Sequence, residues 1–291
     1  MDISKLRVLL SAADNGSLSK AADLLGYTQS GVTHMMNTLE EEAGFPLLTR
    51  GNRGVKLSAD GERLAPLMRE LLACNERLEQ EMALTRGMEQ GHISIGAYAS
   101  VSLHWLPGAL ERFQMNYPGI DVELLEGNGT ELEDWLSEGR IDLAFTSLQP
   151  HFRFDTIELA EDPLYAVLPK NHPMANEDVF PVKRFEGEPF LAYTTATHLD
   201  VDLSRAMRQA NISPKARFSS NYDYTVIAMV EHNLGVTIMS ELILRGRDSG
   251  VACVPLDPPI SRHLGIAMRS RASASPAMRR FIDCAMESIK Y

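Results

Sequence analysis

The first 43 residues contain three segments in which apolar positions recur at the spacing of an amphipathic helix. They span residues 3–15, 19–26 and 28–43, with apolar positions at Leu6, Leu9, Leu10, Ala13, Ala21, Ala22, Leu24, Leu25, Val32, Met35, Met36 and Leu39. We place the leucines and alanines of the second segment on its inner side. Ser17 is a suitable N-cap for that segment, and Gly26 and Gly44 end the second and third segments. Two short β-like runs, residues 47–49 and 55–57, flank a Gly-Asn-Arg-Gly turn. Three helices followed by a hairpin predict a winged helix-turn-helix.

The junction between the second and third segments has the spacing of a helix-turn-helix. Ala22, Gly26 and Val32 supply a small residue where helices cross, a residue tolerant of positive φ, and an apolar knob. The third helix opens with a polar face, formed by Thr28, Gln29, Ser30, Thr33, His34 and Asn37. Such residues at the start of a recognition helix meet base edges and phosphates in a major groove.

A solvated helix face capped by Thr28 explains this polar stretch equally well when it is taken alone. Arg50 and Arg53, on the glycine-rich hairpin, favour DNA binding because they suit phosphate contact beside the groove. The candidate residues for DNA contact are therefore Ser17, Thr28, Gln29, Ser30, Thr33, His34, Asn37, Arg50 and Arg53.

A long helix is predicted over residues 59–90, with Ser58 as its cap and Pro66 in its first turns. Seven residues follow at alternating steps of four and three: Leu64, Met68, Leu71, Asn75, Leu78, Met82 and Thr85. This seam packs either on the chain's own head or against the helix of a second copy. We favour the dimer, because DNA readers of this type pair to match half-sites.

From residue 91 onward, short apolar runs alternate with helical segments of about 10–15 residues. Strands are predicted in HISIGAYA, IDVELLEG, IDLAF, PLYAVLP, PFLAY, VTIM and GIAM. Helices are predicted at Ser100, in TELEDWLSEG, in TVIAMVEHNLG and over residues 278–288. The alternation predicts an α/β domain with mostly parallel sheets.

Chain length, charge, hydropathy and cysteine spacing limit the classes of protein to which this chain can belong. The 291 residues suffice for two domains or one large one at roughly 100–200 residues per domain. A net charge of −11 argues against a surface coated for nucleic acid, but residues 1–58 hold six basic and six acidic side chains and are neutral. With no run of about 18 apolar residues and no signal peptide, we expect a cytoplasmic protein without membrane contact. Cys74, Cys253 and Cys284 are far apart, so we expect buried thiols and neither disulfides nor a metal site.

Two parts of the chain resemble a known family. GSLSKAADLLGYTQSGVTHMMNTLEEEAGFPLLTR and GVKLSADGE resemble the head of LysR-type transcriptional regulators. SIGAYASVSLHWLPGALERFQMNYPGIDVELLEG, LEDWLSEGRIDLAF, YAVLPKNHP and HNLGVTIM resemble the effector-binding domain of that family, so the match runs from about residue 3 to residue 288. Departures from common family residues occur at Leu9, Gly31, His34-Met35 and Leu48. Because the His34 region bears on base preference, an operator sequence is not carried over.

The resemblance implies three parts: a winged helix-turn-helix over 1–58, a linker and dimerisation helix over 59–90, and an effector-binding domain over 91–291. The last would resemble a periplasmic binding protein, with one subdomain formed by 91–162 and 266–291 and the other by 163–265. A small-molecule effector would bind in the cleft between them, beyond the carboxyl ends of strands. The family's pocket positions fall on Ser100, Val101, Ser102, Asn128, Thr146, Ser147, Thr194, Thr195, Tyr222, Asp223 and Tyr224.

These positions suit a small carboxylate or similar anion held by hydroxyls and N–H groups, since no Arg or Lys falls on them. For each residue alone, ordinary N-capping is an equally good explanation. The resemblance further implies sequence-specific binding of double-stranded DNA, assembly into dimers or tetramers, contact with RNA polymerase, and no cofactor. Two other classes remain: a small-molecule binding or transport protein, and an α/β enzyme with an accessory helical domain. The intact head and missing signal peptide argue against the first, and no catalytic motif or ligand cluster supports the second.

Overall fold

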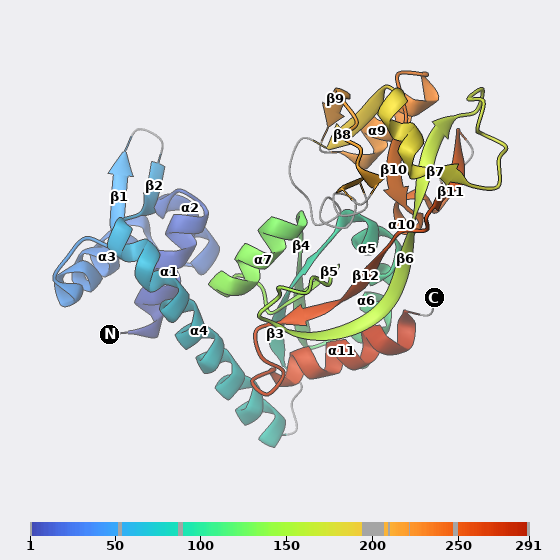
Figure 1. The fold of residues 1–291 in the computed structure, drawn as a ribbon. Coiled ribbons are helices and arrows are strands. Elements are labelled where there is room, and N and C mark those ends of the chain that lie inside the picture. Colours follow the sequence, from blue (N-terminus) through green and yellow to red (C-terminus); the bar gives the residue numbers. More distant parts are fainter. Residues whose placement is uncertain are drawn as a thin grey trace. The chain divides into compact units, whose positions relative to one another are not determined.

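The computed structural model describes residues 2–51, 54–86, 90–193, 207–208, 210–220, 222–246 and 250–289. The chain divides into two compact units, one of residues 1–91 with 137–140 and one of residues 92–136 with 141–291. Figure 1 shows the elements of both units along the chain.

The first unit begins as a winged helix-turn-helix. Its elements are α1 (Ile3–Asp14), α2 (Leu18–Leu25), α3 (Gln29–Ala43), β1 (Leu48–Gly51), β2 (Gly54–Leu57) and α4 (Ala59–Thr85). The three predicted helices and the hairpin are thus confirmed. Leu24, expected on the inner side of α2, is instead 66% exposed. At roughly 100° per residue, Leu24 lies on the far side of Ala21 from Ala22 and Leu25.

Side chains and glycines set the helix ends in this unit. The hydroxyls of Ser17, Thr28 and Ser58 accept hydrogen bonds from backbone N–H groups three residues later, and so cap α2, α3 and α4. Gly26 and Gly44 follow α2 and α3 with φ of 73° and 82°, in the left-handed region that favours glycine. The starts and stops predicted from single residues are therefore confirmed.

The hairpin is fastened to the helices at both ends. Gly54 has φ of 100°, and a Cβ there would lie 2.4 Å from the carbonyl oxygen of Gly16. The neighbouring N–H of Val55 donates to that same carbonyl at 2.9 Å. At the other end, Glu40 Oε1 accepts from the N–H groups of Leu47 and Leu48 at 2.7 and 2.9 Å. The wing is therefore held in a defined position beside α3.

The long helix α4 runs unbroken past Pro66 for 27 residues. Its first turns belong to the head: Ala65 and Met68 are buried in the head core, and Leu64 and Leu72 pack against it. Four further apolar side chains form an exposed stripe, with 46–63% of each accessible: Leu67, Leu71, Leu78 and Met82. Of the predicted seam, Leu64 and Met68 therefore pack on the chain's own head, whereas Leu71, Leu78 and Met82 are exposed. Cys74 is also exposed on this helix, so the expectation of a buried thiol is wrong there.

The second unit contains the remaining elements. Its helices are α5 (Ala99–His104), α6 (Leu106–Asn116), α7 (Gly129–Glu138), the 3₁₀-helix η1 (Val182–Gly187), α9 (Asp223–Glu231), α10 (Glu241–Leu244) and α11 (Pro276–Ser288). Its strands are β3 (Gly91–Ala97), β4 (Ile120–Glu126), β5 (Leu143–Ser147), β6 (Asp155–Pro169), β7 (Phe180–Pro181), β8 (Phe190–Tyr193), β9 (Ala216–Ser220), β10 (Thr237–Ser240), β11 (Val251–Asp257) and β12 (Ser261–Met268). Eight strands form one sheet in the order β4-β3-β5-β12-β6-β11-β7, with β10 paired to β6, and β8 pairs with β9 separately.

Two lobes with separate cores share the strand β6 (Figure 1). Its first part, residues 155–163, pairs with β12, and its second part, residues 164–169, lies between β10 and β11. The first lobe packs Phe113 and Phe145 against Phe281 of the last helix, α11, in a core that includes Leu264 of β12. The second lobe has its own cores, built on residues 164–256.

The sheet is mixed, and the expectation of mostly parallel strands is wrong. β3 and β5 are parallel, but β12 runs antiparallel to both β5 and β6. The physical reason is the crossing between lobes: β6 carries the chain out of the first lobe and β12 carries it back beside β6. No helix within the described ranges is both long and apolar enough to cross a bilayer.

Candidate DNA interface and effector site

The polar face predicted for the third helix is an exposed face of α3. Gln29, Ser30, His34 and Asn37 are exposed, whereas Val32, Met36 and Leu39 on the opposite side are buried. Thr28 and Thr33 are partly committed to the helix itself. Thr28 Oγ1 accepts from the N–H of Gly31 at 3.1 Å, and Thr33 Oγ1 donates to the carbonyl of Gln29 at 3.0 Å. The side chains that remain available to another molecule are mainly amides, a hydroxyl and an imidazole.

The wing adds a cation to this face. Arg50, in β1, donates from Nη2 to Asn37 Oδ1 of α3 at 3.4 Å, so the guanidinium lies beside the polar row. Ser17 is half-buried and caps α2 with its hydroxyl, accepting from the N–H of Lys20 at 3.3 Å. Arg53, the other predicted wing cation, lies outside the described residues.

The acidic run Glu40-Glu41-Glu42 near the end of α3 is not a free acidic patch. Glu40 binds the backbone of the wing, as described above. Glu42 accepts from Lys5 Nζ at 2.5 Å, and this hydrogen bond lowers the pKa of the Glu42 carboxyl. Two of the three acids thus hold the head together, a role that their grouping in the sequence did not reveal.

The predicted effector residues after β3 lie on the short helix α5. Ser100 and Ser102 are 6% and 8% exposed. Val101 is fully buried in the first-lobe core, so its side chain has a packing role. Thr146 and Ser147 end β5 and are also buried. Tyr98, just before α5, donates its backbone N–H to the carbonyl of Phe145, which brings the ends of β3 and β5 together.

A buried ion pair lies beside Ser100. Asp162 of β6 and Arg262 of β12 are directly opposite each other in the sheet register. Arg262 donates to Asp162 Oδ2 from Nε at 2.8 Å and to Ser100 Oγ from Nη2 at 3.2 Å. The guanidinium carbon also lies 5.5 Å from the centre of the Tyr98 ring. Arg262, from a distant strand, therefore places a cation beside Ser100, although none of the predicted effector positions is itself Arg or Lys.

Several buried polar atoms around these elements have no hydrogen-bond partner among the residues that the structure describes. They are the hydroxyls of Ser102, Thr146 and Ser240 and the side-chain carbonyl of Gln149. Gln149 Nε2 donates to Ser147 Oγ at 3.2 Å. A buried polar group without a partner costs roughly 1–3 kcal/mol, so each of these atoms is a candidate to bind water or another molecule.

The other predicted effector residues have local roles or lie elsewhere. Asn128 and Glu131 exchange side-chain and backbone hydrogen bonds at the start of α7, which is the reciprocal arrangement of a capping box. Tyr222 precedes α9 and is 75% exposed, and Asp223 begins that helix half-buried. Thr194 and Thr195 lie outside the described residues.

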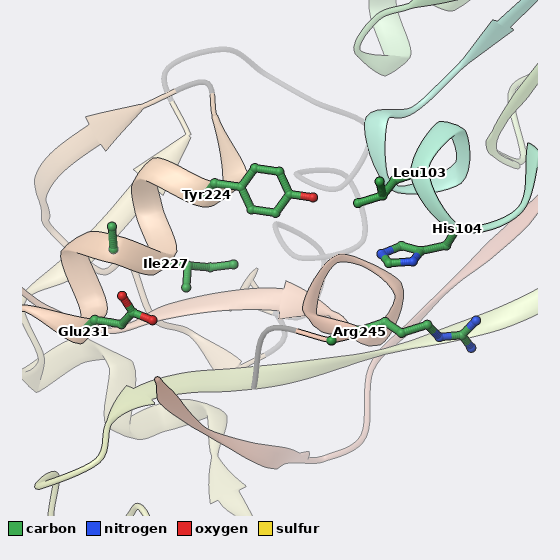
Figure 2. Close-up of a pocket in the computed structure, with 8 residues that line it drawn as sticks. Leu103, His104, Tyr224, Ile227, Glu231 and Arg245 are labelled. Carbon is green, nitrogen blue, oxygen red and sulfur yellow. The ribbon is translucent and has the colours of Figure 1, made fainter. Parts of the chain in front are cut away.

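A pocket of about 540 Å³ lies near the other end of α5. It is lined by Leu103, His104, Tyr224, Ile227, Ala228, Glu231, Arg245 and Gly246. Figure 2 shows Tyr224 reaching from α9 toward Leu103 of α5, with Glu231 at the far end of α9. Among the described effector positions, Tyr224 lines this pocket.

The Cys284 thiol is buried in the first-lobe core. Burial raises the pKa of the Cys284 thiol, which disfavours the reactive thiolate. Within the described part of the chain, no group of three or more His, Cys, Asp and Glu side chains is placed to hold a metal ion.

Comparisons with known proteins agree with this architecture. Residues 3–62 match the bacterial regulatory helix-turn-helix protein, LysR family, and residues 86–290 match the LysR substrate binding domain. The chain is 31% identical to an uncharacterised HTH-type transcriptional regulator, YvbU, of Bacillus subtilis, covering 99% of this chain and 98% of that protein. It is 30% identical to a probable HTH-type transcriptional regulator, LrrA, of Synechococcus elongatus, covering 97% and 96%.

Solved structures share the fold across the whole chain. A full-length OxyR variant from Pseudomonas aeruginosa superposes with a TM-score of 0.78 at 20% identity, covering 99% of this chain and 94% of that one. CbnR, a LysR family transcriptional regulator, gives a TM-score of 0.68 at 18% identity, covering 100% of both chains. Together with the exposed polar recognition helix and the two-lobed second unit, these matches show that the chain belongs to the LysR family of transcriptional regulators, with a helix-turn-helix DNA-binding domain and an effector-binding domain.

Proposed function

We propose that α3 reads an operator in the major groove while the wing contacts the neighbouring phosphates. The observation that carries this assignment is the exposed row Gln29, Ser30, His34 and Asn37 with Arg50 of the wing beside it. Amide side chains bind adenine edges in two-point contacts, and arginine supplies the charge that phosphate contact requires. Arg53, on the same hairpin, is assigned the same role from its place in the sequence.

Self-association would bring two such heads to two half-sites. The exposed stripe Leu67, Leu71, Leu78 and Met82 on α4 supports a dimer through this helix. Pairs of dimers would form tetramers, as expected for the family. The protein would act in the cytoplasm, where its DNA and RNA polymerase are found.

The effector is proposed to be a small polar anion, such as a carboxylate, bound near the carboxyl ends of β3 and β5. Ser100, Ser102 and Ser147 offer hydroxyls there, and Arg262 offers a positive charge behind Ser100. Effector binding would shift the balance between two arrangements of the lobes and thereby change the placement of paired heads on DNA. The ligand must bind one arrangement more tightly than the other for this to occur.

Binding to tiled fragments of the DNA that flanks the protein's own gene, at two salt concentrations, tests the proposal. We expect one protected fragment whose affinity falls as salt rises. Arg50→Ala should weaken binding to every fragment and lower the salt slope by about one. Arg63→Ala is the matched control, because Arg63 is an exposed cation that pairs with Asp60 on α4. Equal slopes for the two variants, or no bound fragment, would contradict the assignment of this interface.

A further inference from the structure

Two opposite charges are buried together where the chain crosses between the lobes. Asp162 is fully buried and Arg262 is 3% exposed. The carboxylate of Asp162, on β6, is held from β12 and from α10, since Oδ2 accepts from Arg262 and Oδ1 accepts from the N–H of Leu242 at 3.0 Å. Each charge therefore has a specific partner, and the pair as a whole is neutral.

The positive end of the pair contacts the effector residue Ser100, so the pair is polarised toward the proposed site. Arg262 Nη2 donates to Ser100 Oγ, which uses an oxygen lone pair and leaves the Ser100 O–H free to donate elsewhere. On strands, side chains two residues apart share a face. Because Leu264 lies opposite Ser147, Arg262 shares its face with Ser147 and Gln149. Thr146 points to the opposite face of the sheet by the same rule.

We propose that the Asp162–Arg262 pair sets the charge of the ligand that this site accepts, and that it selects a singly charged anion. This inference rests on the proposed effector site and specifies its ligand. Arg262 acts through Ser100 as a positioning residue: it orients the hydroxyl and supplies a positive potential at short range. Asp162 cancels that potential at longer range. A neutral ligand therefore gains nothing from the guanidinium, and a second negative charge finds no Arg or Lys among the predicted effector positions.

The two members of the pair should have opposite effects on ligand affinity. Asp162→Asn keeps the shape and the acceptor for Leu242 while removing a negative charge, so anions should bind about tenfold more tightly. Arg262→Gln removes the positive charge, so anions should bind about tenfold more weakly or worse. A pair with a purely structural role would make both variants bind more weakly. Arg262→Lys keeps the positive charge but replaces the planar guanidinium by an ammonium group. Its affinity for anions should stay within about threefold of the native protein's.

The probes are acetate, acetamide and malonate at constant ionic strength, with the full chain. Trp105 directly follows α5 and is 6% exposed, so its fluorescence reports on binding near Ser100. The native protein should prefer acetate over both its neutral isostere acetamide and the doubly charged malonate. Thr237→Val is the matched control, because it removes a buried hydrogen bond from Thr237 Oγ1 to the Leu191 carbonyl, away from the pair. It should leave the ratio of acetate to acetamide affinity unchanged.

Three results would overturn the proposal that the Asp162–Arg262 pair sets the charge of the ligand. They are equal weakening by Asp162→Asn and Arg262→Gln, equal affinity of acetamide and acetate, and failure of all three probes to bind the native protein. Tight acetamide binding that Ser102→Ala removes would leave the effector site itself intact. Probe binding that is insensitive to both Ser100→Ala and Ser102→Ala would instead contradict the location of the effector site.

Discussion

The polar residues of α3 and those around α5 are chemically alike but differ in burial. Gln29, Ser30 and Asn37 are exposed, so water satisfies them until another molecule replaces it. Ser100, Ser102 and Ser147 are buried, and each needs a partner inside the protein or a ligand. An exposed polar row can read a large molecule from outside at no cost to folding. An enclosed polar cluster carries a folding cost that a small ligand can relieve.

The largest difference between the two regions should appear when Asp162 is truncated. Asp162→Ala leaves Arg262 buried without a counter-charge and removes the acceptor for Leu242, so we expect a loss of about 3–5 kcal/mol of unfolding free energy. Urea unfolding followed by tryptophan fluorescence measures this change, because both tryptophans, Trp105 and Trp135, belong to the first lobe. Glu158→Ala is the control, since Glu158 forms an exposed pair with His263 and should cost about 0–1 kcal/mol. Similar losses for the two variants would show that Arg262 finds another partner.

On the exposed side, Gln29→Ala should change recognition without changing stability. Loss of one amide contact to a base pair should reduce discrimination at that position by about 1–3 kcal/mol. Unfolding free energy should stay within about 0.5 kcal/mol, as for other surface substitutions. The loss of discrimination is measured by competition between the protected fragment and versions of it in which each base pair is substituted in turn. Glu41→Ala, an exposed substitution near the other end of α3, should leave the base preference unchanged. An unchanged base preference in Gln29→Ala would mean that the reading face is assigned wrongly.

Ser102→Ala tests whether buried hydroxyls without partners serve the ligand. Its hydroxyl has no partner among the described residues, so its removal relieves a desolvation cost and should raise the unfolding free energy by about 1–3 kcal/mol. DNA binding without effector should also be unchanged, while the response to acetate should weaken. Loss of DNA binding, or a stability loss of several kcal/mol, would assign the hydroxyl a structural role.

The smallest expected effect concerns a half-buried acid, Asp142, just before β5. Burial raises the pKa of Asp142 above its ordinary value of 3.8, although the carboxylate accepts from the N–H of Ser94 at 2.9 Å. The stabilising contribution of the protonated group is complete below pH 3.8 and is lost as pH rises through the raised pKa. Asp142→Asn should therefore gain stability relative to the native protein as pH increases across this range. The test compares the urea midpoints of the native protein and Asp142→Asn at several pH values. A difference between the two midpoints that does not change with pH would contradict a raised pKa for Asp142.

The sequence predicts the head better than the effector site, because the head is built from local signals. Ser17, Thr28 and Gly26 determine helix ends within four residues of their own positions. The burial of α3 follows from residues three and four apart. By contrast, Asp162 and Arg262 are paired across 100 positions. Ser100 was predicted because ligands bind where a strand ends and a helix begins. Neither Asp162 nor Arg262 lies at such a position, so this principle could not identify them. The alternation of apolar residues also failed to predict β9 and β11. It could not predict that β12 is antiparallel to its neighbours, because this direction is set by the return of the chain from the second lobe to the first.

The strand β6 runs through both lobes, and the last helix, α11, completes the core of the first lobe. This arrangement affects the order in which the parts can fold as the ribosome makes the chain. The head core is complete once residue 72 or so has left the ribosome, because its members lie between Leu6 and Leu72. The first lobe waits much longer, since Phe281 and its neighbours on α11 fill a core begun at Ile93. The second lobe is made in between and has cores of its own. A nascent chain therefore has the means to recognise DNA long before it has the means to sense an effector, and the sensing part is assembled last.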